Sequence, residues 1–470
     1  MTSHAPATPA PSRAGGRADG PTAALVVPAA ATLLALMNYT APLTTLVDTA
    51  AGLRAGPTAQ IWIMSSISLG LAAVLLAVGG LADDHGRRRV FTGGAVLLAV
   101  ASAACALAPN ATWFVAGRIV QGAASAALLA GGLGIIGHAF TGPARARATG
   151  VWGAMLGLGI ALGPLATAAL TALVDWRLWY WACLVAAVPL AVAAARSLPE
   201  SRAERPRGLD LPGVVTMSGG VAALLTAITL GRTGWTRPAV AVLLVTAVVL
   251  LGAFVVVEAR RREPMLHLGL LRRPLFVVAT VGALVTGLAV IGVMSYLGTL
   301  LDLAYGLTPV TVSLLLSIWS GLSFVAALQA RRLTARVAPR VLLASGLVLS
   351  AVGEVAMLGL APGGHWWRLV PGLAVAGVGS GLANAMLARL AVESVPADRA
   401  SMGSGANNTA RYVGASLGVA MVVAIATGGD HSLDSLAHGT NIALVISAVL
   451  AVGGAVLAVV VRERRAPRAR

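Results

Sequence analysis

The sequence predicts an all-α polytopic membrane protein with fourteen transmembrane helices, and three observations support this fold class. Of its 470 residues, 57% are hydrophobic and 11% are charged, with a mean hydropathy of +0.85, whereas soluble domains are only about half apolar. Uncharged apolar runs recur along the whole chain, and each has roughly the 20 residues that a membrane-spanning helix needs. The basic residues gather in the short breaks between these runs.

The distribution of arginine predicts the orientation of the chain. All 34 basic residues are arginine: 27 lie in the tails and in alternate loops, and five lie in the opposite loops. Because arginine bias sets topology, we expect a multi-pass protein of the plasma membrane with both termini in the cytoplasm. The predicted spans begin near residues 22, 60, 90, 111, 148, 178, 211, 238, 274, 305, 341, 367, 405 and 440.

The positions of the arginines, cysteines and histidines argue against several classes of function. A net charge of +17 would suggest nucleic acid in a soluble protein, but here the arginines act as orientation signals, so we expect a lipid bilayer and no nucleic acid as partner. Cys105 and Cys183 lie inside apolar runs, which argues against a disulfide framework, and the seven histidines have no metal-ligand spacing. We expect no metal and no cofactor.

The predicted organisation is two six-helix halves joined by a longer linker. Leu333–Arg340 repeats the spacing of Leu81–Arg88, and both stretches lie between two spans on the same predicted side. Such a repeat is typical of halves related by an axis along the membrane normal. We expect a disordered tail at 1–20, the first half at 21–197, a linker with two extra spans at 198–273, the second half at 274–461 and a basic tail at 462–470.

The densest charge cluster is the sequence GGLADDHGRRRV at Gly79–Val90, between two apolar runs. Its glycines permit a close helix approach and a tight turn, and Asp83 can cap the following helix and pair with nearby arginines. The spacing resembles the loop between helices 2 and 3 of the major facilitator superfamily, where the loop acts as a cytoplasmic latch. The alternative is a solvated topogenic turn. The resemblance implies a latch of Gly79, Asp83, Gly86, Arg87 and Arg88.

Two further motifs resemble the fourteen-helix drug:proton antiporters of that superfamily. Arg118-Ile119-Val120-Gln121-Gly122 is similar to the R-x-x-Q-G motif linked there to proton coupling, and an arginine inside a span is a functional candidate by default. The following span ends its small-residue repeat in Gly159, Gly163 and Pro164, like the antiporter motif, although Thr167-Ala168 replaces the usual Gly-Gly. The alternative for Arg118 is an arginine that extends to the membrane interface. The alternative for the glycines is plain small-residue helix packing.

One position departs from the antiporter pattern. The first span has Asn38 where that branch usually has an aspartate, and an amide cannot release a proton. If the protein is proton-coupled, the candidate carboxylates are Asp48, Asp302 and Glu354. The first two are near predicted helix ends, as ordinary interfacial residues are, whereas Glu354 lies inside a span, where a lone ionised carboxylate is costly. Alternatively, Glu354 hydrogen-bonds within the bundle. Arg411 is expected to extend to the interface.

The resemblance implies secondary transport of a small molecule by rocking of the two halves around a central cavity. We expect proton-coupled export of amphipathic compounds, as in multidrug efflux, by a monomer that is not an enzyme. The alternatives are an uncoupled facilitator or importer and, less favoured, an integral-membrane enzyme. The predicted cavity residues are Asn38, Tyr39, Gln121, Trp152, Met155 and Asn384.

Overall fold

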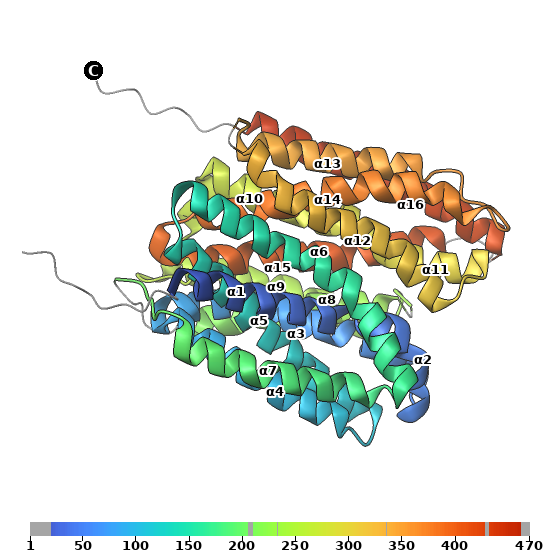
Figure 1. Ribbon diagram of the computed structural model, residues 1–470, viewed down its shortest axis with the longest axis horizontal. Helices are drawn as coiled ribbons and strands as arrows, with labels where there is room; N and C mark the ends of the chain where they lie inside the picture. The colour runs from blue at the N-terminus through green and yellow to red at the C-terminus, as the bar shows by residue number, and fades with distance from the viewer. Residues whose placement is uncertain (1–19, 205–209, 233, 335, 428–431, 462–470) are drawn as a thin grey trace, which may run out of the picture.

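The computed structural model describes residues 20–204, 210–232, 234–334, 336–427 and 432–461. Within these ranges fourteen helical segments are long and apolar enough to cross a membrane, which confirms the predicted all-α fold and span count. The helices lie side by side along one axis, with most of the blue to green helices drawn below and most of the yellow to red helices above (Figure 1). Residues 1–19 and 462–470 of the predicted tails lie outside the described residues.

The first half contains six spans, the first of which is broken. Helix α1 ends at Thr40 and α2 begins at Pro42, whose missing N–H cannot continue the hydrogen-bond ladder. The segments of this half are α1 (Gly20–Thr40), α2 (Pro42–Gly52), α3 (Pro57–His85), α4 (Arg87–Ala106), α5 (Ala111–Ala139), α6 (Gly142–Leu173) and α7 (Arg177–Ser197).

Two spans form the linker between the halves, α8 (Leu211–Gly231) and α9 (Pro238–Arg260), followed by the short helix η1 (Leu268–Arg272). Helix α8 packs against α3 and α15, whereas α9 buries little of its surface. The exposed side chains of α9 include many valines, which suit contact with lipid chains. The linker therefore flanks the two halves and leaves their mutual contact free.

The second half also contains six spans, and its first span is irregular. Between α10 and α11 the helix widens into the π-helical segment η2, a deviation that is frequent at functional sites. The segments are α10 (Pro274–Val285), η2 (Thr286–Ile291), α11 (Gly292–Tyr305), α12 (Pro309–Leu333), α13 (Pro339–Ala356), η3 (Trp366–Arg368), α14 (Leu369–Glu393), η4 (Ala397–Arg399), α15 (Ala400–Ala426) and α16 (Leu433–Val460).

Glycines bring the two halves into close contact along α3 and α15. A methyl group at Gly79 would lie 2.5 Å from the carbonyl oxygen of Ser401, and one at Gly405 would lie 2.5 Å from that of Leu75. Since real Cβ atoms do not approach so closely, only glycine fits at these positions. The end of the bundle where α3 ends and α15 begins is called the latch end below.

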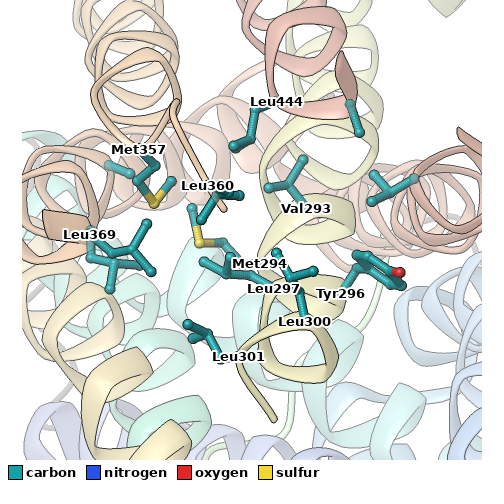
Figure 2. Packing of buried hydrophobic residues seen from close by; sticks show 14 of the residues in the cluster. Val293, Met294, Tyr296, Leu297, Leu300, Leu301, Met357, Leu360, Leu369 and Leu444 are labelled. Carbon is teal, nitrogen blue, oxygen red and sulfur yellow. The ribbon is translucent and has the colours of Figure 1, made fainter. Parts of the chain in front are cut away.

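Packing within the second half is apolar and dense. Side chains from α11, α13, α14 and α16 meet in one cluster, in which Met357, Leu360 and Leu369 lie near Met294 and Leu444 (Figure 2). Between membrane-spanning helices, such side chains stabilise the bundle through close van der Waals packing. The cluster lies toward the end of the bundle opposite the latch, where α13 ends.

Candidate functional site: a charged latch and a cavity between the halves

The latch residues Asp83 and Arg87 form a fully buried ion pair at the turn between α3 and α4. The Arg87 Nη2 atom lies 2.7 Å from Asp83 Oδ1, and neither side chain is exposed. Arg87 also donates to the backbone carbonyl of Asp398 at 2.8 Å and to the Ser401 hydroxyl at 3.2 Å. Because Asp398 and Ser401 belong to the second half, this arginine joins the two halves.

Asp83 caps a helix of the opposite half. Its Oδ2 accepts the backbone N–H of Met402 at 2.7 Å and its Oδ1 accepts that of Ser401 at 3.1 Å. The α15 N-terminus has no side-chain cap of its own, so this carboxylate satisfies free N–H groups and faces the positive end of the helix dipole. The predicted cap on the following helix is wrong: the carboxylate caps α15, because α15 packs directly on the end of α3.

The remaining latch residues have different partners. Arg399 of η4 pairs with Asp84 of α3 and adds a second ionic contact between the halves. Arg88 instead faces Glu200, at the start of the linker directly after α7, at 3.7 Å. Gly86 takes φ +113°, a backbone conformation that requires glycine, and it lies directly beside the Glu200 carboxylate.

Arg118 lies in the core of the first half and is fully buried. Its Nη1 atom donates to the Asn38 carbonyl at 3.0 Å, to Asn38 Oδ1 at 2.9 Å and to Gln121 Oε1 at 3.1 Å. Gln121 in turn donates to the Ser102 hydroxyl at 2.8 Å, and Trp179 donates to Asn38 Oδ1 at 3.3 Å. The residues of the R-x-x-Q-G motif thus form one hydrogen-bond network with Asn38, the residue that stands where the antiporters usually have an aspartate.

This network holds a cation without an anion. Among the described residues no carboxylate forms an ion pair with Arg118, and its Nε and Nη2 atoms have no hydrogen-bond partner. The guanidinium also lies 5.8 Å from the centre of the Tyr180 ring, close enough for a cation–π contact. A buried charge with so few partners is costly, which is typical of a functional position.

The antiporter-like motif of α6 packs this helix against α1. A methyl group at Gly163 would collide with Thr40 and Met37, and one at Gly159 would collide with Leu36. The Pro164 carbonyl accepts the Thr44 hydroxyl at 2.9 Å, which ties α6 to α2. Two earlier glycines of the helix, Gly153 and Gly157, face α14 and α12 of the other half.

A cavity of about 30 Å³ lies between the halves near the middle of the bundle. This volume holds about one water molecule, so the halves are nearly in contact here. Its wall combines apolar, aromatic and polar side chains from both halves. The lining residues are Leu36, Tyr39, Leu156, Ile160, Thr286, Val290, Ile291, Trp319, Ser380, Asn384, Arg411 and Tyr412.

The predicted cavity residues are distributed over three places. Tyr39 and Asn384 lie on the cavity wall. Asn38 and Gln121 lie in the Arg118 network instead, because they occupy the side of α1 and α5 that faces α4 and α7. Two residues of α6 lie beside the wall: Trp152 is buried in a cluster that contains side chains of both halves, and Met155 packs against a cluster formed mostly by the second half.

The three candidate carboxylates also differ in position. Asp48 and Asp302 are exposed. Glu354 is fully buried, and neither of its carboxyl oxygens has a hydrogen-bond partner. It lies near the end of α13 rather than in the middle and does not line the cavity.

The most important residue that the sequence analysis misplaced is Arg411. Helix α15 begins at Ala400, five residues before the predicted start of this span, so Arg411 lies near its middle and only 4% of it is exposed. The prediction that it extends to the interface is therefore wrong. The polar residues Ser401, Ser404 and Asn408 concealed the helix start from a hydropathy pattern, although the rule that a charge inside a span marks a cavity would have found Arg411.

The profile of the Major Facilitator Superfamily matches residues 29–419, most of the chain. The chain belongs to this superfamily. It is 32% identical over 468 residues to the puromycin resistance protein pur8 of Streptomyces alboniger, which covers 94% of the chain and 91% of the relative. It is 31% identical to the multidrug efflux pump LfrA of Mycolicibacterium smegmatis, covering 92% and 86%, and 31% identical to the cephamycin export protein CmcT of Amycolatopsis lactamdurans, covering 87% and 85%.

Solved structures agree on the fold. The human organic anion transporter MFSD10 superposes with a TM-score of 0.70 at 16% identity, covering 93% of the chain and 99% of the transporter. The proton:xylose symporter XylE superposes with a TM-score of 0.69 at 13% identity, covering 94% and 95%. The chain is thus a multi-pass membrane transporter of the drug-efflux type and not an enzyme.

Proposed function

We propose that this transporter exports amphipathic small molecules from the cell in exchange for protons. Two relatives along most of the chain are named for multidrug efflux and for cephamycin export. The observation that carries the proposal is the contact between the halves: a breakable ionic latch at one end and a polar, aromatic cavity at the middle. Rocking of the halves would open the cavity to each side in turn.

The latch end is the cytoplasmic end in this proposal. Arg87, Arg88 and Arg399 lie there, in agreement with the arginine bias of the sequence. Cysteines at Ser3 and Arg468 should then resist an impermeant thiol reagent in intact cells, whereas one at Asp430 should react; all three positions lie outside the described residues. Labelling of either terminus would reverse this orientation.

Glu354 is the proposed proton-coupling acid. It is buried, and its carboxyl oxygens lack partners, so the charge on this group depends strongly on whether water or a donor reaches it. The alternative hydrogen bond to a serine is absent among the described residues. The Ser447 hydroxyl of α16, the helix that packs against α13, is also buried without a partner.

Close packing provides a route from Glu354 to the cavity. Beside it, a methyl group at Gly353 would lie 2.5 Å from the backbone nitrogen of Ala376, so α13 and α14 touch through their backbones. One and two turns further along α14, Ser380 and Asn384 line the cavity. A change of charge at Glu354 would therefore act on the cavity through α14. Arg118 would support coupling by holding Asn38 and α1 beside the same cavity.

Reconstituted vesicles with an imposed pH gradient test this proposal. The panel contains puromycin and a cephamycin, because two relatives are named for them. The wild type should accumulate a substrate against its gradient, whereas Glu354→Gln should retain counterflow exchange but lose pH-driven accumulation. Asp302→Asn is the matched control, since this carboxylate is exposed. Accumulation by Glu354→Gln equal to that of the wild type would exclude Glu354 as the coupling acid.

The second candidate is uncoupled facilitated transport by the same fold. It is favoured by Asn38, which cannot ionise, and by the cavity wall, because none of the described residues that line it is acidic. The same vesicles distinguish the two functions. A facilitator exchanges substrate in the wild type but does not concentrate it, whatever the pH gradient.

A further inference from the structure

The cavity wall carries one residue that is charged at neutral pH. Of the described residues that line the cavity, Arg411 is basic and none is acidic. The four buried carboxyl groups among the described residues are elsewhere: Asp83 at the latch, Asp210 and Glu258 at the linker, and Glu354 on α13. A positive charge in a low-dielectric site acts strongly on any charged ligand.

The guanidinium of Arg411 is available to a ligand. Its Nη2 atom donates to Asn408 Oδ1 at 2.6 Å, but its Nε atom is buried without a partner, and no ion pair forms with this residue in the described part of the chain. On the same wall, Asn384 Oδ1 and the Tyr412 hydroxyl are also buried without partners. Native proteins rarely leave such groups unsatisfied, so three on one wall indicate a ligand that supplies the missing hydrogen bonds.

Aromatic rings surround this arginine. The Tyr39 and Tyr412 rings lie 5.6 Å apart, one from each half, and the Arg411 guanidinium lies 5.1 Å from the centre of the Tyr412 ring. Trp319 completes the aromatic wall, with its indole N–H donating to Ser380 at 3.0 Å. Flat side chains of this kind stack on aromatic ligands.

The backbone next to Arg411 is also specialised. Three lining residues, Thr286, Val290 and Ile291, belong to the π-helical segment η2. In that segment a methyl group at Gly287 would collide with the Arg411 carbonyl. The irregular turn therefore packs directly on the arginine-bearing part of α15.

From these observations we infer that the preferred substrates are aromatic anions, with a carboxylate or phenolate bound by Arg411 and the ring system held between Tyr39, Tyr412 and Trp319. This inference rests on the proposed export function and names its substrate class. A lipophilic cation of the same shape would meet Arg411 as a like charge with no acid to offset it, which selects against it. The contracted cavity must widen to admit the ring system, as rocking of the halves allows.

Binding of two xanthene dyes to purified protein tests the inference without transport. Fluorescein is an anion and rhodamine 6G is a cation on nearly the same ring system, and binding is followed by fluorescence anisotropy in mildly alkaline buffer. The wild type should bind fluorescein about tenfold or more tightly than rhodamine 6G. Arg411→Met should weaken fluorescein about tenfold to a hundredfold, as loss of a charged hydrogen bond does, and Arg411→Lys should restore most of the affinity.

Controls separate this inference from the proposed function. Arg389→Met removes one arginine that pairs with Glu393 outside the cavity, so it should leave the ratio of the two affinities unchanged. Equal or tighter binding of rhodamine 6G by the wild type overturns the inference, and this comparison needs no variant to fold. Loss of fluorescein binding in Arg389→Met as large as in Arg411→Met also overturns it. Selective fluorescein binding without substrate accumulation in vesicles would instead count against export.

Discussion

The latch end and the middle of the bundle both bury charge, but they satisfy it differently. At the latch, Asp83 pairs with Arg87 and caps α15, so each charge has several partners from both halves. At the middle, Arg118 and Arg411 have no acidic partner among the described residues; two nitrogens of Arg118 and one of Arg411 are buried without a hydrogen-bond partner.

This difference indicates two roles for buried charge. A paired charge at a contact between two bodies stabilises one arrangement of those bodies, and its loss leaves the partner uncompensated. An unpaired charge contributes little to folding and is retained at the expense of stability, which is expected where a ligand or a proton arrives during the cycle. The comparison predicts that neutralising a paired charge at the latch destabilises the closed arrangement of the halves. Neutralising an unpaired charge at the middle should leave the folded protein as stable as before or more stable.

The largest effect is expected for Asp83→Asn. The amide cannot pair with Arg87 and is a poorer acceptor for the N–H groups of α15, and breaking a buried pair costs about 3–5 kcal/mol. The closed latch should lose that stabilisation, and transport should fall sharply while the protein still inserts. Spin labels at His85 and Ala397, which are exposed on opposite sides of the latch, should report longer distances in the variant.

Glu393→Gln is the matched control for this experiment. Glu393 pairs with Arg389 within α14 at 2.8 Å and does not join the halves, so the distance distribution and transport should match those of the wild type. The native thiols of Cys105 and Cys183 are buried and do not compete for the labels. An unchanged distance distribution in Asp83→Asn would show that the ion pair does not hold the latch closed.

The sequence predicts which residues of the Gly79–Val90 loop form the latch, but not which residues of the other half they contact. Spacing and charge in Gly79–Val90 identified Asp83 and Arg87, whereas their contacts with Asp398, Ser401 and Met402 lie more than 300 residues away. Such contacts depend on how α3 and α15 pack, which no local pattern encodes. Span count and fold class, in contrast, follow from hydropathy and arginine bias.

The cavity was less predictable for two physical reasons. The side of α1 that carries Tyr39 faces the cavity, while Asn38, one residue earlier, faces Trp179 and Arg118. Helix rotation of this kind is set by packing, and a span that is apolar all round gives no amphipathic stripe to orient it. The predicted position of Arg411 was wrong for another reason: α15 begins with buried polar residues, which hide its start from a hydropathy pattern.

An intermediate effect is expected for Arg118→Met. The apolar side chain removes a buried guanidinium with two unpartnered nitrogens, and Asn38 Oδ1 still accepts from Trp179. Replacing a whole buried ion pair by apolar residues of similar volume is often neutral or stabilising, and we expect the same direction for this unpaired guanidinium, less the cost of the donor lost by Gln121. The melting temperature should therefore stay the same or rise, while substrate accumulation is lost.

Thermal unfolding of the purified variant and vesicle transport check this combination, with Arg118→Lys as the comparison that keeps the charge. A melting temperature well below that of the wild type would place Arg118 with the paired charges of the latch. The prediction that an unpaired buried charge at the middle does not stabilise the fold would then be wrong for Arg118.

The smallest effect is expected for Arg88→Gln, although Arg88 and Arg87 are neighbours in one motif. Arg88 is 36% exposed and lies 3.7 Å from Glu200 at the start of the linker, whereas Arg87 is fully buried and contacts the other half. Partly exposed pairs of this kind are worth about 0–1 kcal/mol, so Arg88→Gln should change the latch distances and the transport rate little. Arg87→Gln, measured in parallel, should resemble Asp83→Asn. Equal losses in the two arginine variants would mean that the total charge of the loop, rather than the contact between the halves, controls the latch.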